Sequence, residues 1–153
     1  VIEFAFDERD TGNASDYLPT IILELVVYTG THDNETLLSW LEDITPAERR
    51  QVRKYLNNFK DSGKELCDDL ICLVMQSVAN LCIVPMQDYL GLDNSARMNQ
   101  PSTLGKNWKW RLKKDSSRQN FRKKCWNWQH ATEEDNKDHS RTSGNWRSFF
   151  FCK

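Results

Sequence analysis

The chain has 153 residues, of which 28% are charged and 39% hydrophobic, and its formal net charge at pH 7 is -1. A net charge this close to zero gives no indication of a nucleic-acid or membrane-surface partner, because both favour a basic surface. No apolar run is long enough to span a bilayer, and no signal peptide is visible.

The first strong pattern is a short apolar strand that runs into polar residues. Residues 26–28 are β-branched or aromatic and predict a buried strand, which Gly30 and Thr31 end. His32 and Asp33 follow directly. The carboxyl ends of strands carry the chemistry in α/β folds, so these two side chains are site candidates. Taken alone, such a pair also has a purely structural explanation.

Three helices are expected after this strand. Asn34 is the predicted N-cap of the first, over residues 35–41. Residues 45–48 form a capping box with proline at the first helical position, and they open a helix that reaches Leu56. Residues 64–81 predict a third helix, whose apolar stripe indicates core rather than a groove for a partner.

A second apolar strand is predicted around Ile83, and it also opens into polar residues. Asp88 follows this strand. Nothing in its surroundings makes it a nucleophile, and we expect it to anchor the loop that follows by hydrogen bonds.

The five cysteines show neither a metal-binding spacing nor a disulfide pattern. Cys67, Cys72 and Cys82 lie in apolar segments, which suits reduced thiols in the core of a cytoplasmic protein, while Cys125 and Cys152 lie near the end. We therefore expect a cytoplasmic protein with no metal and no cofactor.

Several longer motifs follow one another in an order that resembles a known enzyme family. They read YTGTHDNET at residues 28–36, PMQDYLGL at 85–92, ARMNQPST at 96–103 and NWKWR at 107–111. The chain thereby resembles the 4-alpha-glucanotransferases, the amylomaltase or disproportionating-enzyme family, over roughly residues 1–115. Ser102 stands where the family usually has glycine.

The resemblance implies a (β/α)8 TIM barrel, of which this chain would hold only the carboxyl-terminal part. Such barrels need about 250 residues, so the expected fold class is an incomplete α/β barrel portion with the last two strands and their helices. We expect residues 1–115 to belong to the catalytic barrel.

The family resemblance also assigns roles to individual residues. Glycosidic bonds break through an oxocarbenium-like transition state, which a nearby carboxylate stabilises. The resemblance implies that Asp33 is this transition-state stabiliser. It further implies a set of substrate-binding residues that contact an α-1,4-glucan: His32, Asn34, Arg97, Asn99 and Pro101. The nucleophile and the general acid of the family lie on earlier strands and are not in this chain, so the chain alone is expected to be inactive.

An alternative function uses the aromatic residues near position 110. Trp108 and Trp110 alternate with Lys109 and Arg111, and aromatic faces stack on sugars and on bases. The chain could then be a non-catalytic carbohydrate- or nucleic-acid-binding module. A third interpretation is that the two tryptophans pack the end of the barrel.

Two stretches depart from the family pattern. Residues 20–22 read TII where the family has His-Asn-Tyr, and a shifted reading of suitable codons restores that tripeptide. Residues 125–129, read from the third codon base, must give Leu-Glu-Leu-Ala whatever synonymous codons are used. We therefore expect residues 116–153 to be an out-of-frame or disordered tail.

Overall fold

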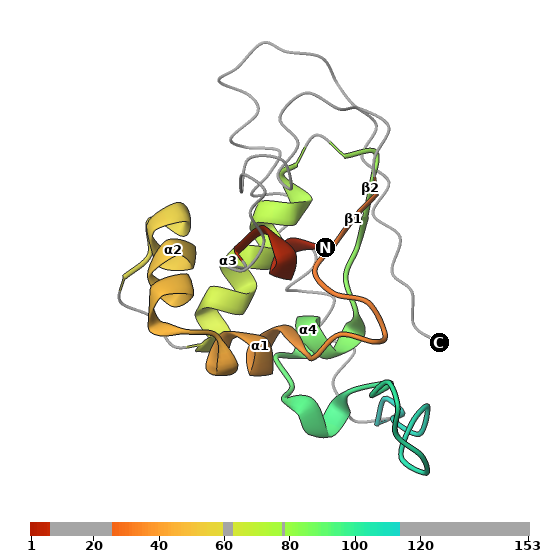
Figure 1. Ribbon diagram of the computed structural model, residues 1–153. Coiled ribbons are helices and arrows are strands. Elements are labelled where there is room, and N and C mark those ends of the chain that lie inside the picture. The colour runs from red at the N-terminus through yellow and green to blue at the C-terminus, as the bar shows by residue number, and fades with distance from the viewer. Residues whose placement is uncertain (7–25, 60–62, 78, 114–153) are drawn as a thin grey trace. The chain divides into compact units, whose positions relative to one another are not determined.

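The computed structural model describes residues 1–6, 26–59, 63–77 and 79–113. Every helix and strand in these ranges belongs to a compact unit that includes Val1–Trp110, and a second unit begins at Arg111. In chain order the elements are η1 (Ile2–Phe6), β1 (Val26–Tyr28), α1 (Leu37–Asp43), α2 (Pro46–Leu56), α3 (Gly63–Met75), β2 (Leu81–Ile83), α4 (Met86–Leu90) and η3 (Asn94–Ala96) (Figure 1).

The two strands pair in parallel, with Val27 opposite Cys82. The chain between them forms α1, α2 and α3, a long connection of the kind that parallel neighbours require. α3 contacts both α1 and α2. As predicted, its apolar stripe belongs to the core, because Leu66, Leu70 and Val74 have no exposed surface. The described residues therefore form a partial α/β arrangement around α3.

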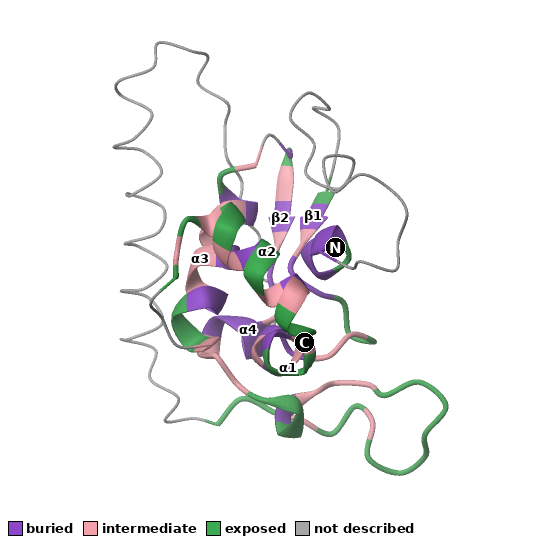
Figure 2. Ribbon diagram, turned by 60° about the vertical axis from the view of Figure 1, so that its left-hand side comes forward, coloured by how far each residue is buried: buried purple, intermediate pink, exposed green. Residues whose placement is uncertain are grey.

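β1 is less buried than the sequence predicted. Val27 is 8% exposed, but Val26 is 45% exposed and Tyr28 is half-buried. Successive side chains of a strand point to opposite faces, and within the described residues only one face of this two-stranded sheet is well covered. The expectation that all three residues are buried was therefore wrong (Figure 2).

The cap of α1 also differs from the prediction. Its N-cap is Thr36, whose hydroxyl accepts a hydrogen bond from the Ser39 N–H. Asn34 does not cap the helix, because its Oδ1 accepts from the Thr31 N–H at 2.9 Å and from the Thr31 hydroxyl at 2.7 Å. The Asn34 side chain, which the sequence assigned to the start of α1, is thus bound within the tight turn that precedes the helix.

The second helix was predicted correctly and the third was predicted too long. Thr45 and Glu48 form the expected reciprocal capping box at the start of α2. α3 ends at Met75, six residues before the predicted end. The Ser77 hydroxyl donates to the Val74 carbonyl at 2.8 Å in the last turn, and Leu81 must already be extended to pair with Val26.

The three described cysteines, Cys67, Cys72 and Cys82, are free thiols, as the sequence predicted. Cys67 and Cys82 are buried, and burial raises the pKa of the Cys82 thiol to about 12. Cys125 and Cys152 lie outside the described residues. Among the residues that the structure describes, no helix is long and apolar enough to cross a membrane.

Asp88, in α4, connects the ends of the two strands. Its Oδ2 accepts a hydrogen bond from the Thr29 hydroxyl at 2.6 Å, and its Oδ1 accepts from the Leu37 N–H at 2.9 Å. The prediction that Asp88 anchors the loop after it was therefore wrong. The neighbouring Gln87 does that instead, since its side-chain amide donates to the Ala96 carbonyl.

We expect Asp88→Ala to destabilise the chain strongly. The substitution leaves two buried donors, on Thr29 and Leu37, without their acceptor, and this should lower the free energy of unfolding by roughly 2 kcal/mol or more. Urea unfolding followed by circular dichroism measures the change. Asp43→Ala, at an exposed position of α1, is the control and should change stability by about 0.5 kcal/mol or less. Equal midpoints for the two variants would contradict the role of Asp88.

Candidate functional site

The predicted His-Asp pair lies on a turn between β1 and α1. Thr29 and Gly30 are buried, whereas Thr31, His32 and Asp33 are exposed. The Asn34 N–H donates to the Thr31 carbonyl at 3.3 Å and closes the turn. The buried start and the closed end of this segment leave the side chains at its tip facing outward.

Asp33 is the centre of a small polar cluster. Its Oδ1 accepts a hydrogen bond from the Asn99 side-chain amide at 2.5 Å and lies 3.3 Å from His32 Nε2. The side chains of His32 and Asp33 are 55% and 49% exposed. Within the described residues, the second carboxylate oxygen of Asp33 has no hydrogen-bond partner. The carboxylate is thus oriented through one oxygen, and the other remains accessible.

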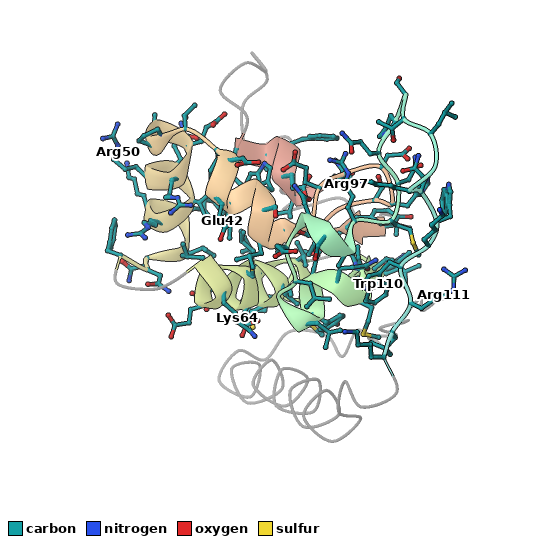
Figure 3. All side chains as sticks on the ribbon, turned by 90° about the horizontal axis from the view of Figure 1, so that it is seen from below. Glu42, Arg50, Lys64, Arg97, Trp110 and Arg111 are labelled. Carbon is teal, nitrogen blue, oxygen red and sulfur yellow. The ribbon has the colours of Figure 1, made fainter. Side chains whose placement is uncertain are left out.

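Arg97 joins the motif at residues 96–103 to the motif at residues 28–36. Its guanidinium donates to the Asp33 carbonyl at 2.6 Å and to the Asn99 carbonyl at 3.0 Å, and it forms an ion pair with Glu35 at 3.7 Å (Figure 3). The Asn99 N–H also donates to the His32 carbonyl at 3.1 Å. The backbones at positions 33 and 99 are therefore fixed relative to each other.

The loop after η3 brings Trp108 to this cluster. The Trp108 ring lies against the His32 ring, with centroids 5.1 Å apart and planes inclined by 39°, and half of the residue is exposed. Trp110 is half-buried. Pro101 is exposed on the same loop, and among the described residues no hydrogen bond or ion pair joins it to Asp33. The structure thus gathers His32, Asp33, Arg97 and Asn99, but not Pro101.

Asn34 was predicted to bind substrate, and its position limits how it could do so. Its Oδ1 already accepts two hydrogen bonds from Thr31, so only its side-chain N–H groups remain to donate to a ligand. Asn34 and Asp33 both line a cavity of about 480 Å³.

This cavity is rich in carboxylates, which sequence reasoning did not anticipate. Its wall holds a single guanidinium, that of Arg97, beside the carboxyl groups of Glu3, Asp33, Glu35, Asp43 and Glu48. In the described ranges, no cluster of three His, Cys, Asp or Glu side chains is arranged to hold a metal ion. The lining instead offers hydrogen-bond acceptors and negative charge.

Glu3 is the functional candidate that sequence reasoning missed. It is 4% exposed, and its Oε1 has no hydrogen-bond partner among the described residues. Burial raises the pKa of this carboxyl to about 8, with the carboxylates of Asp88 and Glu35 adding to the rise and Arg97 opposing it. The sequence did contain an indication of this buried acid, because Glu3 is the one charged residue within the otherwise apolar residues 1–6.

A family model described as 4-alpha-glucanotransferase matches residues 1–117. The chain belongs to this family. The motif resemblance is thus confirmed, and it places the Asp33 cluster within the matched part of a 4-alpha-glucanotransferase.

Individual relatives agree with this membership. The chain is 42% identical over 113 residues to "4-alpha-glucanotransferase DPE1, chloroplastic/amyloplastic" of Oryza sativa subsp. japonica, and 41% identical over 118 residues to the 4-alpha-glucanotransferase of Thermus thermophilus. Each match covers 73% of this chain, but only 18% of the rice protein and 23% of the Thermus protein. The chain therefore spans about a fifth of the length of these relatives.

A solved structure is similar as well. The amylomaltase from Streptococcus agalactiae in complex with acarbose has a TM-score of 0.76 and 27% sequence identity to this chain. The match covers 87% of this chain and 26% of the amylomaltase. The structural likeness and the family match therefore point to the same kind of protein.

We expect Glu3 to make the stability of the chain depend on pH. The pKa of Glu3 is raised from 4.5 to about 8 in the folded state, so the carboxyl contributes most below pH 4.5 and its contribution is lost as the pH rises toward 8. Burial also raises the pKa of Asp88, to about 6, so the range above pH 6 reports mainly on Glu3.

Urea unfolding between pH 6 and 8 measures this dependence. Stability should fall by about 1.4 kcal/mol for each pH unit in which only the unfolded state is ionised. Glu3→Gln removes the titration and should flatten the curve, whereas Glu42→Gln, on the exposed side of α1, should leave it unchanged. The same slope with and without Glu3 would contradict the raised pKa.

Proposed function

We propose that this chain is the carboxyl-terminal barrel segment of a 4-alpha-glucanotransferase that transfers α-1,4-glucan segments with retention of configuration. The observation that carries the proposal is the hydrogen bond between Asn99 and Asp33. It joins the motif at residues 28–36, at the end of β1, to the motif at 96–103, which follows the parallel neighbour β2 after α4 and η3. Parallel neighbours with a helical connection between them are what a portion of a (β/α)8 barrel requires.

Asp33 is proposed as the transition-state stabiliser. A sugar ring gains positive charge as its glycosidic bond breaks, and a fixed carboxylate beside the ring lowers the energy of that state. Asn99 holds one carboxylate oxygen of Asp33, which supports a fixed orientation, and the other oxygen is accessible to sugar hydroxyls. His32 lies beside the same carboxylate and is proposed to donate to a hydroxyl of the same sugar.

The other predicted binding residues divide by their surroundings. Asn99 donates to the Asp33 carboxylate, and Arg97 donates to the Asp33 backbone carbonyl. These bonds support roles that combine substrate binding with the positioning of Asp33. Asn34 is proposed to donate through its amide N–H groups. Pro101 remains a predicted contact on the exposed loop. The binding-module alternative is weaker, because the Trp108 ring packs against His32 instead of standing free as a platform.

Residues 1–115 are proposed as part of the barrel, and the predicted tail at residues 116–153 lies outside the described residues, as do residues 20–22. Cytoplasmic placement remains a prediction from the reduced thiols. An α-1,4-glucan is the proposed substrate, and no nucleic-acid or membrane partner is proposed.

A hybrid enzyme tests the proposed activity directly. Residues 26–113 of this chain replace the matching segment of the Thermus thermophilus relative, which supplies the earlier strands and avoids both departing stretches. Incubation with maltotriose should yield glucose together with longer oligosaccharides. Glucose and maltose without any longer oligosaccharide would show hydrolysis and contradict transfer. The 153-residue chain by itself should give neither product, because a glycosyl-enzyme intermediate needs a nucleophile that it lacks.

The same hybrid tests Asp33. Asp33→Asn keeps the size of the side chain and removes its charge, so turnover should fall by roughly two orders of magnitude or more, equivalent to roughly 3 kcal/mol. KM should change less. Asp93→Asn is a matched control, because asparagine caps η3 as well as aspartate does and Asp93 is exposed. Near-native turnover of Asp33→Asn would make Asp33 merely structural.

A further inference from the structure

The loop that ends at Trp108 has an unusual backbone. Ser102 and Trp108 have φ values of 62° and 63°, and Gly105 has a φ of 92°. A large side chain rarely adopts the left-handed region, and such strain persists only where the surrounding structure enforces it. Strained positions of this kind concentrate at functional sites, so the forces that hold Trp108 in place are informative.

Asn107 closes this loop on itself. Its side-chain oxygen accepts from the Gln100 N–H at 3.0 Å, and its side-chain amide donates to the carbonyls of Thr103 at 3.0 Å and Gln100 at 3.2 Å. The Trp108 N–H then donates to the Met98 carbonyl at 2.7 Å. These bonds fix the base of the loop and enforce the positive φ of Trp108.

The enforced backbone places the indole ring on His32. The two ring centroids are 5.1 Å apart, within the range of favourable aromatic contacts, and His32 Nε2 lies 3.3 Å from Asp33 Oδ1. The His32 side chain is 55% exposed, so little else limits its rotation on the solvent side. The ring contact therefore restricts the imidazole to positions beside Asp33.

We propose that Trp108 is a positioning residue that fixes the His32 imidazole beside the Asp33 carboxylate. The role in turnover rests on the proposed function, whereas the ring contact itself does not. The loop strain serves this contact, because relaxing φ at position 108 would swing the indole away from the site. In this role Trp108 acts through His32, whose ring it contacts.

Two substitutions separate the ring from the backbone. Trp108→Phe keeps an aromatic ring and the same backbone strain, whereas Trp108→Gly relieves the strain and removes the ring. A loop that merely needs a stable backbone would tolerate glycine better than phenylalanine. A positioning ring predicts the reverse order. Leu104→Ala, at a residue that is 98% exposed in the same loop, is the control.

Nuclear magnetic resonance of the 153-residue chain tests the contact without any activity. The chain has three histidines, and His32→Gln identifies the imidazole signal of His32. In the parent chain and in Leu104→Ala, the indole ring current should displace this signal. Trp108→Gly should return it to the position of a free histidine, and Trp108→Phe should leave it in between. A His32 signal that is identical in all of these variants would overturn the proposal.

Kinetics of the hybrid enzyme test the consequence. Trp108→Gly should lower kcat roughly tenfold with a smaller change in KM, as misplacement of a catalytic group does, and Trp108→Phe should restore most of the loss. A rise in KM at constant kcat would instead mean direct stacking on the sugar and would overturn the positioning role. If the unsubstituted hybrid gives no transfer, the proposed function fails, and the resonance experiment still decides the contact.

Discussion

The buried carboxylate of Asp88 is the interaction on which the arrangement of the site depends. It accepts one hydrogen bond from Thr29, at the end of β1, and one from the Leu37 N–H, at the start of α1. The turn that carries His32 and Asp33 lies between these two points. Because both ends of the turn bind the same side chain, the distance between the two ends and the direction in which the chain leaves the turn are fixed.

The same carboxylate is costly to bury, which explains why both of its partners matter. Burial raises the pKa of Asp88 to about 6, while the hydrogen bonds from Leu37 and Thr29 act in the opposite direction. A buried carboxylate without such partners would take up a proton instead. Asp88 also raises the pKa of Glu3, so the protonation of one buried acid depends on the charge of the other. The interior behind the His-Asp turn is therefore an electrostatically coupled unit.

Local sequence signals predicted local features well. The capping box of Thr45 and Glu48 lies within four residues of chain, and it appears as expected. The first and second strands were placed by runs of apolar residues and by family motifs. The prediction that Asn34 is the N-cap of α1 was wrong for a local reason. The N–H and hydroxyl of Thr31 both bind the Asn34 side-chain oxygen, which was expected to cap the helix.

Interactions between distant residues could not be predicted in the same way. The partners of Asp88 lie 59 and 51 residues away in the chain, and no periodicity encodes them. The end of α3 depends on the pairing of Leu81 with Val26. The polar cluster is intermediate, since the family resemblance named Asp33 and Asn99 but gave no indication that they bind each other. The sequence motifs identified the residues of the site, but only the fold determines which of them contact each other.

The hydrogen bond from Asn99 has a consequence for how Asp33 could work. One of its carboxylate oxygens is occupied by an amide that is itself held by the backbone, since the Asn99 N–H donates to the His32 carbonyl. Incoming hydroxyl groups must therefore meet the other oxygen or displace the amide. A carboxylate oriented in advance loses little freedom when charge develops beside it, and such preorganisation is what makes fixed charge effective in a transition state. The two loops thus provide, by binding each other, the rigidity that the proposed chemistry at Asp33 requires.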